Sequence, residues 1–195
     1  SKYDEPFWGV VTEIDVTIAY KLCKEKNYSF FSYYLHKSIV AVNETEEFKY
    51  RIENDRILIY DTIHTSATIG REDGTFAFSF VEYDPDYAVF DRNLKTEIQD
   101  IQNSVGLRNK PEYVRKDVIH YSSLPWTTFT GLTHARNFNI IDSVPKITFG
   151  KMFKREGKDY MAVALNAHHG LTDGLHASKF FDLFQKLMNS DEFKV

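Results

Sequence analysis

The sequence predicts an α+β domain in which helices pack on one β-sheet. Stretches typical of strands and of helices follow one another without the strict alternation of a doubly wound parallel fold. Met161–Ala167 is an almost continuous apolar run, as expected of a strand covered on both faces. Gly174–Met188 carries apolar side chains at helical spacing. With 195 residues, 43% of them hydrophobic, the chain is long enough to bury a core of its own, so we expect one domain over residues 1–195.

The first part of the chain predicts one strand and then two helices. Trp8–Ile18 alternates apolar and polar side chains, which is the pattern of a half-buried strand. Helices are expected over residues 17–27 and 29–43, the second with apolar side chains three and four residues apart. Two short strands are then expected, at Phe48–Ile52 and Ile57–Tyr60.

The rest of the chain predicts further strands and two more helices. Thr75–Glu82 alternates as a strand, and Asp84-Pro85 opens a helix for which Gly106 is the expected stop. The polar stretch Arg108–Lys116 predicts a loop. The last expected elements are strands from Val118 through Ser122–Thr127, at Ile147–Phe153 and at Met161–Ala167, and the helix Gly174–Met188.

Composition and charge exclude several classes of protein. The formal net charge of −4 lacks the basic excess of a nucleic-acid-binding protein. The single cysteine, Cys23, excludes an internal disulfide and a multi-cysteine zinc site. No apolar stretch of membrane-spanning length and no signal peptide are visible, so the expectation is a cytoplasmic protein. The chain does not begin with Met, and we expect a native N-terminal segment to precede it.

One segment, Asn166–His176, concentrates groups that can do chemistry. A buried strand runs into His168-His169, and Asp173-Gly174 opens the final helix, where Asp is a natural N-cap. His169 would lie where strand becomes loop, with a side chain suited to general-base work. The alternative is that the histidine pair only packs beside the helix cap. A zinc site is disfavoured because the two rings point to opposite sides of the strand and no ligand follows at a suitable spacing.

The pattern His-His-x-x-x-Asp-Gly at residues 168–174 resembles the signature of coenzyme A-dependent acyltransferases of the chloramphenicol acetyltransferase family. Ser122-Ser-Leu-Pro-Trp126 and Pro145-x-Ile-Thr-x-x-Lys151 resemble two further segments of that family. The resemblance covers essentially the whole chain and implies a two-layer sandwich of the chloramphenicol acetyltransferase type. Related classes fit less well. Condensation domains and plant acyltransferases carry two such lobes, which this chain is too short to contain. Dihydrolipoyl acyltransferases usually have Asp-His-Arg where this chain has His168-His169-Gly170.

The resemblance also implies roles for single residues. His169 is the expected general base, Ser122 the expected oxyanion donor, and Asp173 a residue that pairs with an arginine near the N-terminus. Lys151 falls on a lysine that contacts the phosphate of the coenzyme. Thr148 falls on a threonine that contacts the reacting centre through water, and Phe76 on a phenylalanine of the substrate pocket. Without the resemblance, Thr148 is an ordinary strand residue and Phe76 an ordinary core residue.

The same resemblance implies partners and an assembly. Acetyl-CoA is the expected co-substrate, no cofactor or metal is expected to be bound permanently, and the second substrate is a small acceptor such as chloramphenicol. The family places its active sites between the subunits of a homotrimer, so we expect a homotrimer here. Neither nucleic acid nor a membrane is an expected partner.

Two residues depart from the family pattern. At the eighth and tenth positions after Trp126, where the family usually has aliphatic side chains lining the acceptor pocket, this chain has His134 and Arg136. They predict either a more polar or anionic acceptor, or a shifted loop in which Arg136 makes a surface ion pair. An acyltransferase with another acceptor therefore stays open as an alternative, as does a non-catalytic trimeric binding module of the same fold.

Overall fold

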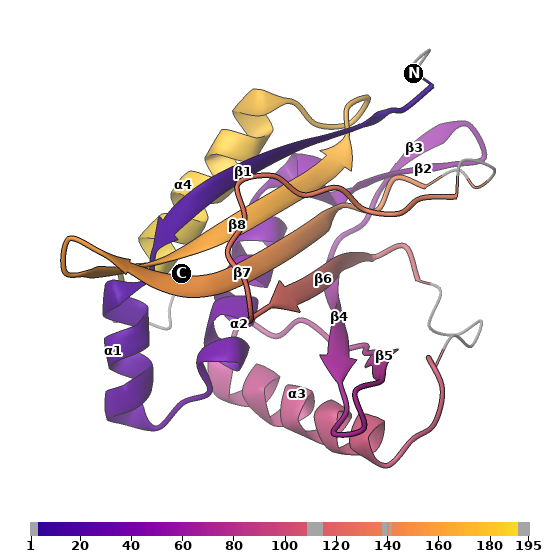
Figure 1. Cartoon of the computed structure of the whole chain (residues 1–195). Helices are drawn as coiled ribbons and strands as arrows, with labels where there is room; N and C mark the ends of the chain where they lie inside the picture. Colours follow the sequence, from indigo (N-terminus) through magenta and orange to yellow (C-terminus); the bar gives the residue numbers. More distant parts are fainter. Residues whose placement is uncertain (1–3, 109–114, 138–139, 141, 191–195) are drawn as a thin grey trace.

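A six-stranded mixed sheet with helices packed against it forms the body of the protein (Figure 1). The computed structural model describes residues 4–108, 115–137, 140 and 142–190. The sheet order is β1-β8-β7-β6-β4-β5, and β4 and β7 both run parallel to β6. The strands are β1 (Phe7–Asp15), β4 (His64–Gly70), β5 (Phe76–Phe78), β6 (Val118–Leu124), β7 (Lys146–Arg155) and β8 (Lys158–His168). The predicted α+β class is confirmed.

Four helices, one 3₁₀ turn and one short hairpin complete the described chain. None of these helices has both the length and the apolar character that crossing a membrane requires. The helices are α1 (Thr17–Lys26), α2 (Phe30–Asn43), α3 (Tyr87–Gln102) and α4 (Gly174–Met188); the 3₁₀ turn is Glu46–Lys49, and the hairpin pairs β2 (Tyr50–Glu53) with β3 (Arg56–Ile59).

The core lies between the sheet and helices α2 and α4. The ring of Phe149, on β7, lies 4.5 Å from that of Tyr34 on α2 and 6.1 Å from that of Phe184 on α4, measured between centroids. Tyr121, on β6, stacks on the same ring at 5.9 Å. Burying four large rings in one contact region gives the sheet a strongly apolar face on the helix side. The high aromatic content of the sequence is therefore partly explained by this core.

The register of β6 and β7 decides which polar side chains leave the core. Ser123 is paired with Phe149, so both belong to the helix-covered face, whereas Ser122 is paired with Thr148. Residues directly opposite each other on neighbouring strands share a face, and successive residues alternate. Ser122 and Thr148 therefore lie on the face of the sheet that the helices leave uncovered.

Several predicted boundaries are wrong for local reasons. The strand expected over Trp8–Ile18 ends at Asp15, because the Asp15 carboxylate accepts hydrogen bonds from the backbone N–H and the hydroxyl of Thr17, where α1 begins. Phe48 was expected to open a strand, but it is fully buried in the 3₁₀ turn. The expected strand at Ser122–Thr127 stops at Leu124, because Pro125 has no N–H for the ladder.

The middle of the chain shows two further differences. The expected strand Thr75–Glu82 is reduced to Phe76–Phe78, and the neighbouring strand β4 was not predicted at all. The sequence of β4, His-Thr-Ser-Ala-Thr-Ile-Gly, is small and polar and does not alternate, although most of it is buried. Helix α3 ends at Gln102, before the expected stop at Gly106. Residues 109–114 of the predicted loop lie outside the described residues.

Candidate active site

His169 directly follows β8, in an exposed turn that leads to α4. Its backbone N–H donates to the Pro6 carbonyl at 2.7 Å, which ties the turn to the start of β1. Its ring lies 5.8 Å from the ring of Trp8. The Nδ1 atom of His169 is 3.1 Å from the backbone carbonyl of Thr172, and the Trp8 indole N–H donates to the same carbonyl at 3.2 Å. Three local contacts thus position this imidazole.

The Thr172 carbonyl also selects the tautomer of His169. A carbonyl oxygen only accepts hydrogen bonds, so the nitrogen that faces it must carry the proton. A neutral His169 therefore has its proton on Nδ1 and its basic lone pair on Nε2. This is the arrangement that a general base requires.

His168 has a different environment on the opposite side of the strand. Its side chain is 6% exposed, its Nδ1 accepts the backbone N–H of Gly170 at 3.0 Å, and its ring meets that of Phe7 edge-on at 5.8 Å. Burial lowers the pKa of His168. The two histidines point to opposite sides of the strand, as expected from the sequence, and His168 is engaged in packing and in the turn.

Asp173 is the N-cap of α4. Its Oδ1 accepts the backbone N–H of Leu175 at 2.9 Å and of His176 at 3.4 Å. The Nδ1 atom of His176 in turn accepts the backbone N–H of Asp173 at 3.0 Å, which completes a capping box. The Nε2 atom of His176 reaches Glu47 at 3.2 Å. Among the described residues, the contacts of Asp173 are thus to the helix terminus and His176, and the expected arginine partner is not one of them.

A cavity of about 650 Å³ on the uncovered face of the sheet brings several predicted residues together. Ser122, Phe76 and His134 all line it. Thr148 is 1% exposed and does not itself line the cavity, but its hydroxyl lies 3.4 Å from Nε2 of His134, which does. Burial, helped by the charge of Lys146, lowers the pKa of His134. The cavity therefore joins the expected oxyanion donor to the expected acceptor-binding residues.

Arg136 is not among the residues that line this cavity. It forms an ion pair with Glu5, and its guanidinium lies 3.9 Å above the centroid of the Phe7 ring. The side chain is 10% exposed, so it is held between the start of β1 and its own loop. Of the two possibilities that the sequence left open for Arg136, the ion pair fits these contacts.

Lys151 lines a different, smaller cavity of about 310 Å³. This cavity lies on the helix side of the sheet, where Ser123, Phe31 and Tyr34 also line it. The backbone N–H of Lys151 donates to the Thr127 carbonyl at 2.8 Å, and the Lys151 side chain is exposed. The Lys151 ammonium is thus available at the rim of an aromatic cavity, separate from the one that holds Ser122.

The chain does not bring His169 to Ser122. His169 shares its side of the sheet with Trp8, which is paired with Ala167 on the helix-covered face, and it lines none of the cavities described here. Ser122 lies on the opposite face, two strands away from β8. The two expected catalytic groups of one chain are therefore on different surfaces.

Sequence reasoning missed several residues of the larger cavity, among them His120, which lies beside Ser122. His120 lines it two positions before Ser122, on the same face of β6. Burial is the main reason that the pKa of His120 falls to about 4, and the neighbouring Lys146 lowers it further. The period of two along the strand was the signal that could have found it, because it places residues 120 and 122 side by side.

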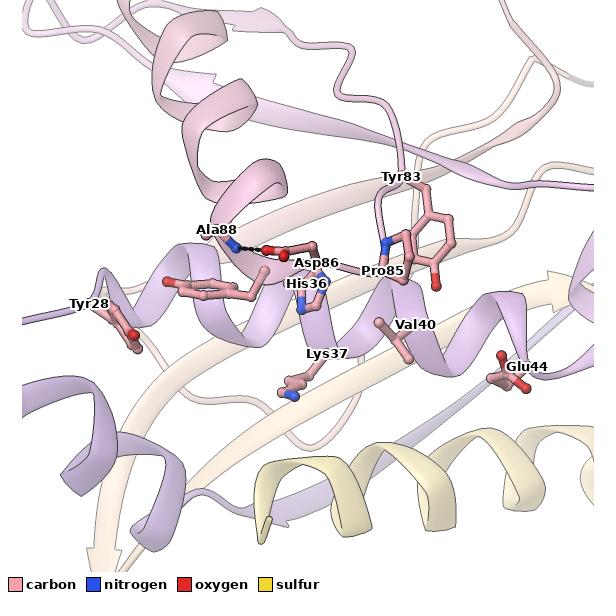
Figure 2. Close-up of a pocket in the computed structure, with 10 residues that line it drawn as sticks. Tyr28, His36, Lys37, Val40, Glu44, Tyr83, Pro85, Asp86 and Ala88 are labelled. Carbon is pink, nitrogen blue, oxygen red and sulfur yellow. Dashed lines mark hydrogen bonds between the residues drawn. The ribbon is translucent and has the colours of Figure 1, made fainter. Parts of the chain in front are cut away.

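A further cavity, of about 590 Å³, lies between α2 and the segment that leads into α3 (Figure 2). His36 points toward Pro85 and Asp86, and its Nε2 lies 3.1 Å from the Asp84 carbonyl. Burial lowers the pKa of His36 to about 4. None of the predicted site residues lines this cavity. No group of three or more metal-ligating side chains occurs within the described parts of the chain.

Comparison with known proteins agrees with the resemblance seen in the sequence. Residues 6–185 match the family described as chloramphenicol acetyltransferase. A chloramphenicol acetyltransferase of Bacillus pumilus is 28% identical over 182 residues, which cover 93% of this chain and 82% of that protein. A solved chloramphenicol acetyltransferase has a TM-score of 0.89 at 28% identity, covering 95% of this chain and 90% of that one. A probable dihydrolipoamide acetyltransferase from Listeria monocytogenes shares the fold, with a TM-score of 0.74 at 16% identity, covering 96% of this chain and 86% of that one.

Proposed function

The chain belongs to the chloramphenicol acetyltransferase family, and we propose that it transfers acetyl from acetyl-CoA to a hydroxyl of a small acceptor such as chloramphenicol. It is an acyltransferase. The observation that carries the mechanism is the contact of His169 Nδ1 with the Thr172 carbonyl, since it places the ring proton on Nδ1 and the basic lone pair on Nε2.

In the proposed reaction, His169 Nε2 takes the proton of the acceptor hydroxyl as the oxygen attacks the thioester carbonyl carbon. A tetrahedral oxyanion forms, and the Ser122 hydroxyl donates a hydrogen bond to it. The oxyanion then collapses, the carbon–sulfur bond breaks, and the imidazolium returns its proton to the departing thiolate. The products are the acetyl ester and the free thiol of coenzyme A, with no acyl-enzyme.

The separation of His169 from Ser122 supports a site built from two copies of the chain. One copy would supply His169, and its neighbour would supply the cavity of Ser122, Phe76, His134 and the adjoining Thr148. Trp126, four residues after Ser122, is 81% exposed, and a large exposed aromatic side chain is a common feature of an interface. A homotrimer, as in the family resemblance, is the proposed assembly.

The cavity at Lys151 is the proposed entry for coenzyme A. An ammonium at the rim suits a phosphate, and the aromatic walls suit the pantetheine chain. Asp173 is proposed to act through structure, by capping α4 and so fixing the turn that carries His169. Since acetyl-CoA is an intracellular metabolite, the proposed location is the cytoplasm, and acetylation of chloramphenicol there would confer resistance to it.

Release of free thiol from acetyl-CoA in the presence of chloramphenicol tests this function. We expect acceptor-dependent thiol release and an acetylated product of the expected mass. A protein that binds acetyl-CoA but releases no thiol with chloramphenicol or any other hydroxyl acceptor would instead be a non-catalytic module of the same fold.

A further inference from the structure

Arg136 is one of the two departures from the family pattern, and the proposed function gives it no role. It does not line the cavity of Ser122, and its side chain is only 10% exposed. Its guanidinium forms an ion pair with Glu5 and lies 3.9 Å above the centroid of the Phe7 ring. A guanidinium that is mostly shielded from solvent binds an aromatic face more strongly than an exposed one does. Arg136 therefore fastens the loop between β6 and β7 to the start of β1.

The start of β1 also holds the turn that carries the expected base. The Pro6 carbonyl accepts the backbone N–H of His169 at 2.7 Å. The Trp8 indole N–H donates to the Thr172 carbonyl at 3.2 Å, and that carbonyl faces Nδ1 of His169 at 3.1 Å. Both ends of the turn are thus tied to β1, by the residues directly before and after Phe7.

Glu5 and Phe7 connect these two sets of contacts. One carboxylate oxygen, Glu5 Oε1, accepts a hydrogen bond from the Phe7 backbone N–H at 2.8 Å and another from the Arg136 guanidinium. The Phe7 ring, which lies under that guanidinium, also meets the ring of His168 at 5.8 Å. Pro6 stands between Glu5 and Phe7 in the chain, so Arg136 contacts both neighbours of the peptide whose carbonyl anchors the turn.

We propose that Arg136 is a positioning residue for the general base, which acts through Glu5 and Phe7 on the turn that carries His169. The inference rests on the proposed acetyl transfer. A loosened turn would misplace the imidazole nitrogen that takes the proton, and a displacement of about 1 Å at a reacting group can cost about 10²-fold in rate. Because His169 and Ser122 lie on different surfaces, Arg136 serves the site to which its own chain gives the base.

Steady-state kinetics separate this role from acceptor binding. Arg136→Leu removes the charge and keeps an apolar side chain, and we expect kcat to fall by about 10-fold while KM for the acceptor stays within about two-fold. Arg136→Lys keeps a cation for Glu5 and Phe7 and should recover most of kcat. His134→Leu, in the same loop but in the cavity wall, should act mainly on KM for the acceptor. A loss in Arg136→Leu that lies in the acceptor KM would overturn the inference, as would an unchanged kcat.

Mixed assemblies separate positioning from a general effect on folding. Chains with Ser122→Ala keep the base and chains with His169→Ala keep the cavity, so a refolded mixture has active sites that need one chain of each kind. Arg136→Leu added to the Ser122→Ala chain should lower the activity of the mixture by about 10-fold, and added to the His169→Ala chain it should change it by less than about two-fold. An equal loss from either chain, or a larger loss from the second, would overturn the inference.

The ring nitrogens of His169 give a readout that does not depend on turnover. In the wild type, NMR of the neutral ring should show the proton on Nδ1; in Arg136→Leu the signals of the two nitrogens should move toward each other, because the turn no longer selects one tautomer. A protein that shows this change but releases no thiol with any acceptor keeps the positioning of His169 and rejects the proposed acetyl transfer. A protein that releases thiol, with a kcat and ring signals that Arg136→Leu leaves unchanged, keeps the proposed function and rejects the role of Arg136.

Discussion

At the scale of single residues, one backbone carbonyl, that of Thr172, positions the expected general base. The Thr172 oxygen accepts from Trp8 and holds the Nδ1 atom of His169, so the orientation and the tautomer of the imidazole are both set before any substrate binds. A preorganised base of this kind needs no rearrangement when the acceptor arrives. His168, one residue earlier, is turned to the other side and is engaged with Gly170.

Replacement of His169 should therefore abolish turnover while leaving the fold intact. We expect His169→Ala to lower kcat by about 10²–10⁴-fold, the usual contribution of a general base, because the side chain is exposed and supports little of the core. Steady-state kinetics with acetyl-CoA and the best acceptor measure this. His168→Asn, which keeps an acceptor for the Gly170 N–H, is the matched control; the assignment within the pair is wrong if the control loses activity and His169→Ala keeps it.

Ser122 should matter in the transition state and little in substrate binding. Ser122→Ala removes one donor to the oxyanion, for which about a 10²-fold loss in kcat with nearly unchanged Michaelis constants is expected. A variant of Ser122 that raises KM for either substrate and leaves kcat intact would show a binding role instead.

Buried His36 should make the protein sensitive to mild acid. Its pKa is about 4 in the folded state because of burial, against about 6.5 in an unfolded chain. As the pH falls, the unfolded state therefore takes up the proton on His36 before the folded state does. The contribution of His36 to the free energy of unfolding is complete above about pH 6.5. It falls by about 3 kcal/mol as the pH drops toward 4. Urea unfolding of wild type and His36→Phe between pH 7 and 4.5 should show a shallower decline in the variant; identical slopes would contradict this.

At the scale of elements, the unit that carries the chemistry is β8, its turn and α4. The strand is paired with β1 from Tyr160 to His168, and the helix packs Phe180 and Phe184 into the core. The capping box of Asp173 and His176 joins the two parts directly beside Thr172. The Thr172 carbonyl that contacts His169 is therefore held between two well-packed elements, β8 and α4.

Loss of the Asp173 cap should lower the free energy of unfolding, and any loss of activity should follow from that destabilisation. Asp173→Ala is expected to lower the free energy of unfolding by about 0.5–2 kcal/mol, whereas Asp173→Asn keeps a good N-cap and should stay close to wild type. Chemical denaturation measures the first effect, and kcat measured well below the unfolding transition measures the second. If Asp173→Asn loses activity as completely as His169→Ala while remaining folded, the carboxylate has a direct role that capping does not explain.

The elements that sequence predicted well are those with one dominant pattern. Helix α4 is found at its expected bounds, because its apolar stripe, the Asp173 cap and the Gly174 start all agree. Strand β4 was not predicted because small polar residues such as Thr65 and Ser66 are buried there only through contacts with neighbouring strands. The β-propensity of the sequence does not reflect such contacts. The early end of the first strand depends on one side-chain contact of Asp15, which periodicity cannot reveal.

At the scale of the whole molecule, the sheet separates the two expected catalytic groups. The family resemblance pointed to His169 and Ser122 individually, but only strand order and register show that they lie on opposite faces. The position of His120 beside Ser122 follows from strand alternation, and the ion pair that takes Arg136 out of the cavity depends on a contact with Glu5, 131 residues away in the chain. Such long-range pairing is what the sequence alone leaves open.

The separation of the two groups allows a direct test of the shared active site. His169→Ala and Ser122→Ala are each prepared, unfolded, mixed in equal amounts and refolded together. If one chain supplies the base and its neighbour supplies the oxyanion donor, random assembly restores about one quarter of the sites, and the mixture should regain about that share of wild-type activity. A mixture no more active than the average of the two separately refolded variants would contradict a site shared between copies.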